Sequence, residues 1–176
     1  IKYTLRPSYL STAEQEEEID KKVQALLNNE FSGWETMDEF SRVKMVYKWV
    51  TYNFTFVGGS DRHSTYSGII EYETVCQGFS TTIYRLLREM GISCRVISNE
   101  DHGWNIVRIG NYYYNLDSTW DVKTKESEWS NFLLCNSSFE LGEMHNRGDR
   151  FSTDEFSQKY PMSLEDYQWE PQDDLV

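Results

Sequence analysis

The sequence is poor in proline, with 3 residues among 176, and equally poor in cysteine, again with 3. Three cysteines cannot all pair within one chain, which argues against a small fold held by several disulfides, although a Cys94–Cys135 bridge stays open for an exported protein. No apolar run is long enough to span a bilayer, and we find no secretion-signal pattern or internal repeat. The length suffices for one compact domain with its own core, so we treat residues 1–176 as a single domain.

Basic residues are also scarce. The chain has 17 Lys and Arg against 29 Asp and Glu, which gives a net charge of −12. Nucleic acids and anionic membrane surfaces select basic faces, so we expect neither as a partner. An acidic surface suits a cationic or amine-bearing substrate, and it also keeps a protein soluble. Aromatic residues, by contrast, are abundant at 15%, which predicts an aromatic-lined core or groove.

The residues that could carry chemistry gather between Val75 and Asp121. At the start of this stretch, apolar residues recur every three or four positions, which predicts the buried face of a helix: Cys76, Phe79, Ile83, Leu86, Leu87 and Met90. Gly91 is suited to ending this helix, and Gly78 to a close approach of backbone or substrate at its first turn. The cysteine thus lies at a helix N-terminus, where the helix dipole and free N–H groups favour a thiolate and a nearby oxyanion.

A hairpin follows the helix. The segments WNIVRI and YYYNLD flank Gly110-Asn111, a dipeptide that suits a two-residue loop. Such a loop pairs Ile109 with Tyr112. Since side chains alternate along a strand, this register places His102 and Asp117 on one face as diagonal neighbours, with Cα atoms roughly 7–8 Å apart. A three-residue loop would break the alternation.

Together these residues predict a catalytic triad. A cysteine thiolate can attack a carbonyl carbon, a histidine can take and return the proton, and an aspartate can orient the histidine and stabilise its charge. We assign these catalytic roles to Cys76, His102 and Asp117. Cysteine is among the most buried residue types, so Cys76 alone would more often be structural, but its two partners at matching positions favour catalysis.

The order VCQGF, HGWN and YYYNLDSTWD resembles the transglutaminase-like superfamily, and in particular its bacterial branch. The resemblance covers most of the chain from about Trp34 onward. It implies an α+β fold with a papain-like, transglutaminase-like core, in which a catalytic helix packs on an antiparallel sheet. By this match Cys76 is the nucleophile, His102 the base and Asp117 the third member of the triad, with no cofactor and no calcium site carried over.

Two N-terminal helices are predicted outside this stretch, with residues 1–33 as a helical extension and residues 34–165 as the core. Ser11 with Glu14 forms one capping box, and Thr36 with Glu39 forms another. The second box opens a helix that should pack on the catalytic helix. TYNFTFV is predicted to be a short strand or an extended link, WSNFLLCN a buried strand, and SSFELGEMH a short helix.

The sequence defines the oxyanion donors less clearly than it defines the triad. Papain-like enzymes use a glutamine a few residues before the nucleophile, whereas here Gln77 follows the cysteine. We expect backbone N–H groups at the cysteine to serve, with the Tyr52 hydroxyl and the Trp49 indole as further candidates. Trp104 and Trp120 either line a substrate groove or shield the triad from water.

The sequence supports a functional role less strongly for two further histidines and for a metal site. His63 lies in a polar loop with nothing at motif spacing beside it. His145 falls where bacterial relatives often carry another histidine, and we expect a structural role for it rather than a place in the triad. Cys76, His102 and Asp117 are also metal-ligand types, but no CxxC or HExxH accompanies them and zinc would quench the nucleophile, so we assign no metal site.

The functional prediction is cysteine-dependent acyl transfer on amide bonds through a thioester. Water as the acceptor gives protease-like peptide or amide hydrolysis, and a primary amine gives protein-glutamine transamidation. Hydrolysis is favoured, because the sequence shows none of the extra domains of calcium-dependent animal enzymes. We expect a protein or peptide substrate, with a primary-amine acceptor for transamidation, and favour an extracellular or cell-surface location over the cytoplasm. The alternative is a catalytically inactive transglutaminase-like module that binds peptide or cell-wall material.

Overall fold

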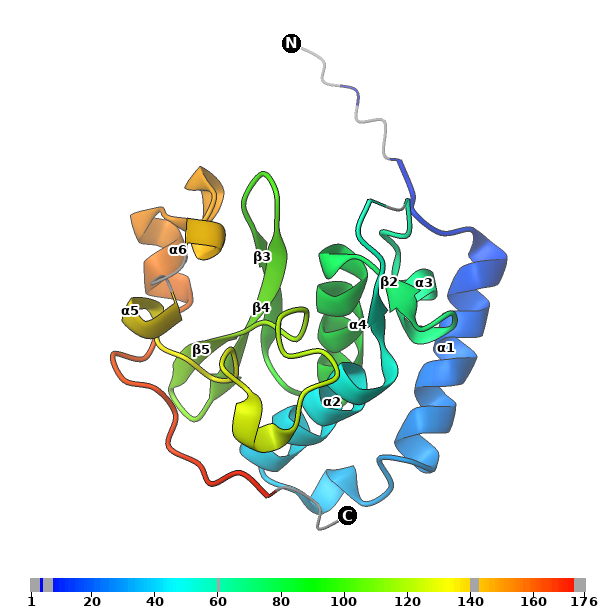
Figure 1. Cartoon of the computed structure of the whole chain (residues 1–176), viewed down its shortest axis with the longest axis horizontal. Coiled ribbons are helices and arrows are strands. Elements are labelled where there is room, and N and C mark those ends of the chain that lie inside the picture. Colours follow the sequence, from blue (N-terminus) through cyan, green and yellow to red (C-terminus); the bar gives the residue numbers. More distant parts are fainter. Residues whose placement is uncertain (1–3, 5–7, 60, 140–142, 173–176) are drawn as a thin grey trace.

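The computed structural model describes residues 4, 8–59, 61–139 and 143–172. Helices cover one face of a three-stranded antiparallel sheet. The other face is covered by residues 136–139 and 143–163, which we call the C-terminal segment (Figure 1). This arrangement confirms the predicted α+β class with its helix on an antiparallel sheet. None of the helices in these ranges has both the length and the apolar character needed to cross a bilayer.

The elements follow one another in a simple order. The helices are α1 (Ala13–Asn28), α2 (Glu39–Asn53), α3 (Thr65–Ile69), α4 (Cys76–Glu89), α5 (Asn136–Phe139) and α6 (Asp154–Lys159). The strands are β1 (Thr55–Phe56), β2 (Glu73–Thr74), β3 (Cys94–Ser98), β4 (Gly103–Ile109) and β5 (Tyr112–Leu116). Short 3-10 turns lie at Trp34–Thr36, Glu126–Glu128, Glu143–His145 and Asp149–Phe151.

α1 begins one residue later than predicted. Its capping box is Thr12 with Gln15, not Ser11 with Glu14. The N–H of Gln15 donates to Thr12 Oγ1 at 3.2 Å, and the N–H of Thr12 donates to Gln15 Oε1 at 2.9 Å. The predicted apolar stripe of this helix is buried as expected: Ile19, Val23, Leu26 and Leu27. These residues belong to the same core as the catalytic helix, while the division at residue 33 stays a prediction.

α2 begins after Asp38 rather than at the predicted box of Thr36 and Glu39. The Asp38 carboxylate accepts a hydrogen bond from the N–H of Ser41 at 2.7 Å. Thr36 ends a 3-10 turn that follows Gly33, whose φ is +88°. An aspartate directly before the helix therefore satisfies its first N–H groups, and the earlier threonine has no capping role.

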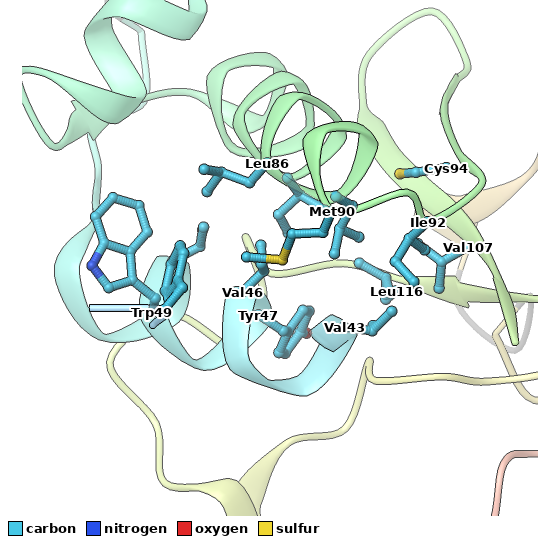
Figure 2. Close-up of a cluster of buried hydrophobic side chains, with 14 of the residues drawn as sticks. Val43, Val46, Tyr47, Trp49, Leu86, Met90, Ile92, Cys94, Val107 and Leu116 are labelled. Carbon is cyan, nitrogen blue, oxygen red and sulfur yellow. The ribbon is translucent and has the colours of Figure 1, made fainter. Parts of the chain in front are cut away.

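The packing of α2 on α4 is as predicted. Figure 2 shows the side chains of α2, α4 and the sheet meeting in one hydrophobic core, with Val43, Val46, Tyr47, Trp49, Leu86, Met90, Ile92, Cys94, Val107 and Leu116 labelled. Complete burial of each large apolar side chain contributes about 1.5–3 kcal/mol. This core therefore fixes the axis of α4, and with it the position of Cys76.

The hairpin has the predicted register. Ile109 pairs with Tyr112, and Asn105 with Leu116, around a two-residue loop in which Gly110 has φ +62°. Gly91 directly follows the last turn of α4 with φ +75°, the left-handed conformation that closes many helices. Local sequence signals therefore place the end of the catalytic helix and the loop of the hairpin correctly.

Of two segments predicted to be extended, the first contains a short strand as predicted, and the second forms no strand. In TYNFTFV, the first three residues belong to α2, and Thr55–Phe56 pairs in parallel with Glu73–Thr74. WSNFLLCN is a bent segment that meets the sheet through a bridge between Asn115 and Leu134. Leu133 has φ +56°, a left-handed conformation that interrupts an extended run. SSFELGEMH contains α5 and a 3-10 turn, with residues 140–142 outside the described residues.

The second face of the sheet has its own smaller core. Side chains from β3, β4 and β5 pack there against the C-terminal segment: Ile97, Trp104, Ile106, Tyr113, Phe139, Phe151 and Tyr160. Backbone hydrogen bonds add to this contact, since the N–H of Tyr113 donates to Pro161 O and the N–H of Ser163 donates to Tyr113 O, both at 2.9 Å. The C-terminal segment is therefore fastened to the sheet that carries His102.

Cys94 and Cys135 are both free. Cys94 lies at the start of β3 in the large core, where burial raises the pKa of its thiol. The Cys135 sulfur contacts the hydroxyl groups of Ser137 and Ser138. The open question of a Cys94–Cys135 bridge is thus decided against, and buried thiols of this kind are unreactive.

Candidate active site

Cys76 is the first residue of α4, as predicted. The residue before it, Val75, is extended, and its N–H donates to Arg62 O at 3.1 Å, which fixes how the chain enters the helix. The first N–H groups of a helix have no acceptor within the helix, so those of Cys76 and Gln77 are not paired by α4 itself and lie at its positive end. The thiol is half-buried on the wall of a cleft of about 370 Å³.

Gly78 makes room for protein atoms rather than for substrate. A Cβ atom at this position would lie 1.9 Å from the Thr74 hydroxyl and 2.9 Å from Ser64 O. The Thr74 hydroxyl itself donates to Arg62 O at 2.7 Å. The glycine therefore lets the strand before the nucleophile pack directly under the first turn of α4.

His102 lies between Cys76 and Asp117. The residue is 8% exposed, and its Nε2 lies 2.5 Å from Asp117 Oδ2. Because Nε2 faces the carboxylate, the other ring nitrogen, Nδ1, is left available to Cys76, which lines the same cleft as His102. The structure thus brings together the three residues that the sequence proposed as a triad.

The electrostatics of the three groups favour separated charges. Burial opposes ionisation of Cys76, but hydrogen bonds from His102 and the N–H of Gly103 outweigh it and lower the pKa of the thiol. Burial likewise opposes protonation of His102, yet hydrogen bonds to Asp117 and Cys76 raise its pKa to about 9. Hydrogen bonds from His102 and His145 overcome burial and lower the pKa of Asp117. All three shifts act toward a thiolate and an imidazolium beside a carboxylate.

Asp117 is anchored through its backbone and its second oxygen. Oδ1 accepts from the N–H of Thr119 at 2.9 Å, and the Asp117 N–H donates to Asn131 O at 2.9 Å. The buried Tyr47 hydroxyl lies 3.0 Å from Asp117 O and 2.7 Å from Asp121 Oδ2. No motif or spacing in the sequence indicates that Tyr47 and Asp121 lie together. Their shared hydroxyl–carboxylate contact links α2 to the backbone of Asp117.

His145 joins the site in a way that the sequence did not predict. Its Nε2 lies 3.0 Å from Asp117 Oδ2, the same oxygen that contacts His102. The ring is 6% exposed and stacks on Phe139 with centroids 3.9 Å apart. The sequence offered only the family position as a signal, because nothing in the local pattern ties residue 145 to residue 117.

The cleft beside Cys76 is lined mainly by polar side chains. They include Gln77 and Ser80 from α4, Asn99 and Asp101 from the turn before His102, and His63 from the polar loop. His63 is exposed there, although no residue at motif spacing accompanies it in the sequence. The predicted aromatic-lined groove is not what forms this cleft, since the aromatic residues fill the cores instead.

Two of the predicted oxyanion donors lie away from the cleft. Trp49 is buried in an aromatic cluster with Phe31 and Phe54. Tyr52 is exposed, and its carbonyl accepts from Lys123 Nζ at 2.5 Å. Neither residue lines the cleft, which corrects the sequence assignment: α2 turns one toward the core and the other toward solvent.

The two tryptophans of the hairpin region differ in role. Trp104 is 1% exposed and stacks on His102 with centroids 6.0 Å apart and planes at 20°. It shields the triad from water, which decides between the two predicted roles. Trp120 is 53% exposed and meets the His102 ring edge-on at 6.3 Å.

The ligand atoms of three buried residues lie close enough to suggest a metal site. Atoms of His102, Asp117 and His145 all lie within 4.8 Å of one another. Two ligands of one tetrahedral zinc ion, each about 2.0–2.1 Å from it, lie roughly 3.3 Å apart. The observed 2.5 and 3.0 Å contacts are hydrogen-bond distances, so the group fits two N–H donors on one carboxylate better than it fits zinc.

Comparison with solved structures finds partial likenesses of low identity. A TGase is 19% identical with a TM-score of 0.46, over 62% of this chain and 33% of that one. Menin, whose structure shows the binding site for the Mixed Lineage Leukemia protein, is 17% identical with a TM-score of 0.43, over 61% and 26%. A candidate cysteine protease from Cytophaga hutchinsonii is 18% identical with a TM-score of 0.40, over 64% and 41%. The chain thus spans only between 26% and 41% of the length of these proteins.

The family itself is defined by sequence. No curated protein matches the chain. The core model of the transglutaminase-like superfamily matches residues 25–132, a range that contains Cys76, His102 and Asp117. The branch of the superfamily stays a prediction. This match covers more than half of the chain, and the chain therefore belongs to the transglutaminase-like superfamily.

Proposed function

We propose that this protein is a cysteine-dependent acyltransferase that cleaves amide bonds of proteins or peptides through a thioester at Cys76. One observation carries the proposal: Cys76 at the start of α4 lines the same cleft as His102, whose Nε2 lies 2.5 Å from Asp117 Oδ2. Nucleophile, base and orienting carboxylate are thus connected in series, as acyl transfer requires.

The first half-reaction forms the thioester. The Cys76 thiolate attacks the amide carbon, a C–S bond forms, and the carbonyl electron pair moves to oxygen. The His102 imidazolium then gives its proton to the leaving nitrogen as the C–N bond breaks. Asp117 holds the ring so that Nε2 stays protonated and Nδ1 faces the sulfur. The products of this step are a free amine and an acyl group on Cys76.

The second half-reaction releases the acyl group. A water molecule or a primary amine approaches the thioester, and His102 takes its proton as the new bond to carbon forms. The C–S bond breaks, and the electron pair returns to sulfur as thiolate. Both acceptors use the same residues, so the triad alone does not select between hydrolysis and transamidation.

Backbone N–H groups are the proposed oxyanion donors. The N–H groups of Cys76 and Gln77 lie at the positive end of α4, next to the carbon that the sulfur attacks. Gln77 also lines the cleft, so its side-chain amide is a further donor in reach of the substrate. This choice replaces Trp49 and Tyr52, which lie elsewhere.

We favour hydrolysis as the main outcome. Polar side chains line the cleft, including those of Gln77, Asn99 and Asp101, and the thiol is only half-buried. Water therefore reaches the thioester unless an amine substrate displaces it. A dry, aromatic passage, which transamidation would need to compete with water, is not part of the cleft lining among the described residues.

A substrate screen tests the proposal. Peptides and glutamine donors are incubated with and without a primary amine, and the products are read by mass spectrometry. Peptide cleavage or ammonia release without amine incorporation identifies hydrolysis, and amine incorporation identifies transamidation. The Cys76→Ala variant serves as the blank.

Alkylation provides a test that needs no substrate. Iodoacetamide at neutral pH should label Cys76 much faster than an ordinary thiol, because the thiolate is favoured there, and His102→Ala should remove the difference. If Cys76 reacts no faster than a free thiol, the triad is inactive and the protein is a binding module of this superfamily.

A further inference from the structure

We infer that His145 is a positioning residue of the active site, and that Asn99 holds it in place. The inference rests on the proposed function, since it concerns how Asp117 and His102 are kept ready for Cys76. His145 belongs to the C-terminal segment, beyond residues 25–132 that match the superfamily core. The site is thus completed by a part of the chain outside the matched range.

The first argument is the bonding of the Asp117 carboxylate. Oδ2 lies 2.5 Å from His102 Nε2 and 3.0 Å from His145 Nε2, while Oδ1 accepts from the N–H of Thr119. Asp117 is 1% exposed, so these three contacts stand in for water. An ionised carboxylate has no proton to donate, so both Nε2 atoms must carry hydrogen. Since Nε2 is engaged by the carboxylate, Nδ1 of His102 is the ring nitrogen left for the cysteine.

The second argument is how firmly the His145 ring is held. It stacks on Phe139 with centroids 3.9 Å apart and planes at 26°, and it meets Trp104 edge-on at 5.5 Å. Trp104 in turn stacks on His102. The ring plane of His145 is therefore set by packing, so its N–H can direct the carboxylate rather than follow it.

The third argument is the side chain of Asn99, which joins the two histidine segments. Its Oδ1 accepts from the N–H groups of Asp101 and His102 at 3.0 and 2.8 Å. Its Nδ2 donates to Met144 O and Asn146 O at 2.8 and 3.1 Å, the residues on either side of His145. One amide thus fixes the backbone of His102 and of the His145 turn relative to each other.

These contacts give His145 a role that core packing alone would not need. A phenylalanine would fill the same space against Phe139, but it would leave one side of Asp117 Oδ2 without a donor. The carboxylate would then be free to rotate away from His102, and the imidazolium that stabilises the Cys76 thiolate would be less well placed. Reactivity of Cys76 should therefore depend on the N–H of His145.

The test compares two substitutions of different chemistry. His145→Phe keeps a ring for stacking and removes the N–H, while His145→Gln places an amide N–H near the former Nε2 position. The rate of Cys76 carboxamidomethylation by iodoacetamide is measured by mass spectrometry. We expect His145→Phe to be about tenfold slower than the wild type, and His145→Gln to recover most of the rate, as loss of one hydrogen bond to a charged group predicts.

The outcomes separate the inference from the proposed function. If wild-type Cys76 is fast and His145→Phe is equally fast, His145 has no positioning role. If both variants are equally slow, packing rather than the N–H matters, and the inference also fails. A wild-type Cys76 that reacts like a free thiol overturns the proposed function instead.

A second variant tests Asn99. Asn99→Asp keeps the acceptor for the His102 N–H but removes the donors to the His145 turn. It should slow alkylation, and the double variant with His145→Phe should be no slower than His145→Phe alone. A simple effect of the added negative charge would instead add to the effect of His145→Phe, which would contradict the link through Asn99.

Histidine NMR tests the wild-type protein directly. The chain has 3 histidines, so ring ¹⁵N–¹H correlations give three spin systems, with the exposed His63 as the internal reference. We expect His102 and His145 both to carry hydrogen on Nε2. A His145 ring protonated on Nδ1 alone cannot donate to Asp117, and this result would overturn the inference even if every variant failed to fold.

Discussion

The two faces of the β3–β4–β5 sheet are built in different ways. One face packs on α2 and α4 through the large hydrophobic core (Figure 2). This core holds the helix that begins at the nucleophile Cys76. The other face packs on the C-terminal segment through a smaller core and a series of loop hydrogen bonds, and it brings in His145. His102 and Asp117 contact both sides. The comparison teaches that the residues of the attack and the residues that orient them are held by separate parts of the chain.

The difference is also one of physical forces. The helical face gains its rigidity from apolar burial, which is insensitive to direction. The C-terminal face relies more on directed contacts, such as the Asn99 amide and the hydrogen bonds of Tyr113 to the segment around Pro161. We therefore expect substitutions on the first face to act mainly on stability, and those on the second to act mainly on the reactivity of Cys76.

The largest effect should come from the nucleophile itself. Cys76→Ala removes the sulfur at the start of α4, and acyl transfer should fall by roughly 10⁴-fold or more, because the remaining groups form no thioester. The measurement is turnover of the substrate found in the screen. Cys94→Ala, which changes a buried thiol on the same helical face, is the control and should keep its turnover. Comparable losses in both variants would show that the sulfur chemistry is not at Cys76.

Asp117→Asn should have the next largest effect. The carboxylate of Asp117 accepts hydrogen bonds from both histidines, whereas an asparagine amide would present an N–H to one of them. The tautomer of His102 would therefore be disturbed, and turnover should drop by roughly 10³–10⁴-fold. Asp121→Asn is the matched control, since Asp121 is buried nearby and contacts Tyr47 but not His102. It should lower the unfolding temperature more than it lowers turnover per folded molecule.

A pair of phenylalanines tests the two faces directly. Phe79 lies in the helical core and Phe139 in the smaller core, and they are 1% and 3% exposed. Phe79→Ala should cost about 3–5 kcal/mol of unfolding free energy, as expected for a large cavity. Phe139→Ala should cost less but slow Cys76 alkylation more, because it releases the His145 ring. Urea unfolding measures the loss of stability, and iodoacetamide labelling measures the rate of Cys76 alkylation. If both variants lose the same stability and the same alkylation rate, the two faces do not differ in role.

The positive charge of protonated His102 should make the stability of the protein depend on pH. The folded protein holds the His102 proton more tightly than the unfolded chain, with a pKa of about 9 against an ordinary 6.5. The resulting stabilisation is therefore full below pH 6.5 and is lost as the pH rises through about 9. The difference in unfolding free energy between wild type and His102→Gln should accordingly shrink across this window. A difference that grows with pH would show that the ring is neutral in the folded state.

Ser98→Ala should have the smallest effect. It removes the hydrogen bond that Arg150 Nη2 donates to Ser98 Oγ at 2.9 Å, while the backbone bond from the N–H of Gly148 to Ser98 O remains. Since Arg150 is exposed, we expect less than about 0.5 kcal/mol of stability to be lost and little change in alkylation. A large change in alkylation would mean that docking of the C-terminal segment depends on this single contact.

The sequence located the helical face and the hairpin well. The apolar spacing from Cys76 to Met90 predicted α4, and the Gly110-Asn111 loop predicted the register that brings His102 to Asp117. Both patterns are local and have a fixed period. A shift of either pattern by one residue would have moved every side chain to another face. The capping residues were missed by one or two positions, because several neighbouring polar residues could each serve as a cap.

The sequence placed two oxyanion candidates wrongly, and it predicted a strand near residue 132 where the described structure has a bent segment. Trp49 and Tyr52 are suitable residue types, but the rotation of α2 about its axis, set by packing, turned them away from the cleft. WSNFLLCN has the apolar character of a strand, yet Leu133 takes a left-handed conformation in a bent segment. In both cases tertiary contacts overrode a residue-type argument.

By itself, the sequence determined that a cysteine begins a helix and that a histidine and an aspartate face each other across a hairpin. Only the tertiary structure decided that His145 shares the Asp117 oxygen, and that Asn99 binds the turn that carries it. The physical reason is range: helix and hairpin patterns act over a few residues, whereas these contacts join residues 28 and 45 positions apart. Their geometry depends on how the C-terminal segment packs on the sheet, which no local pattern encodes.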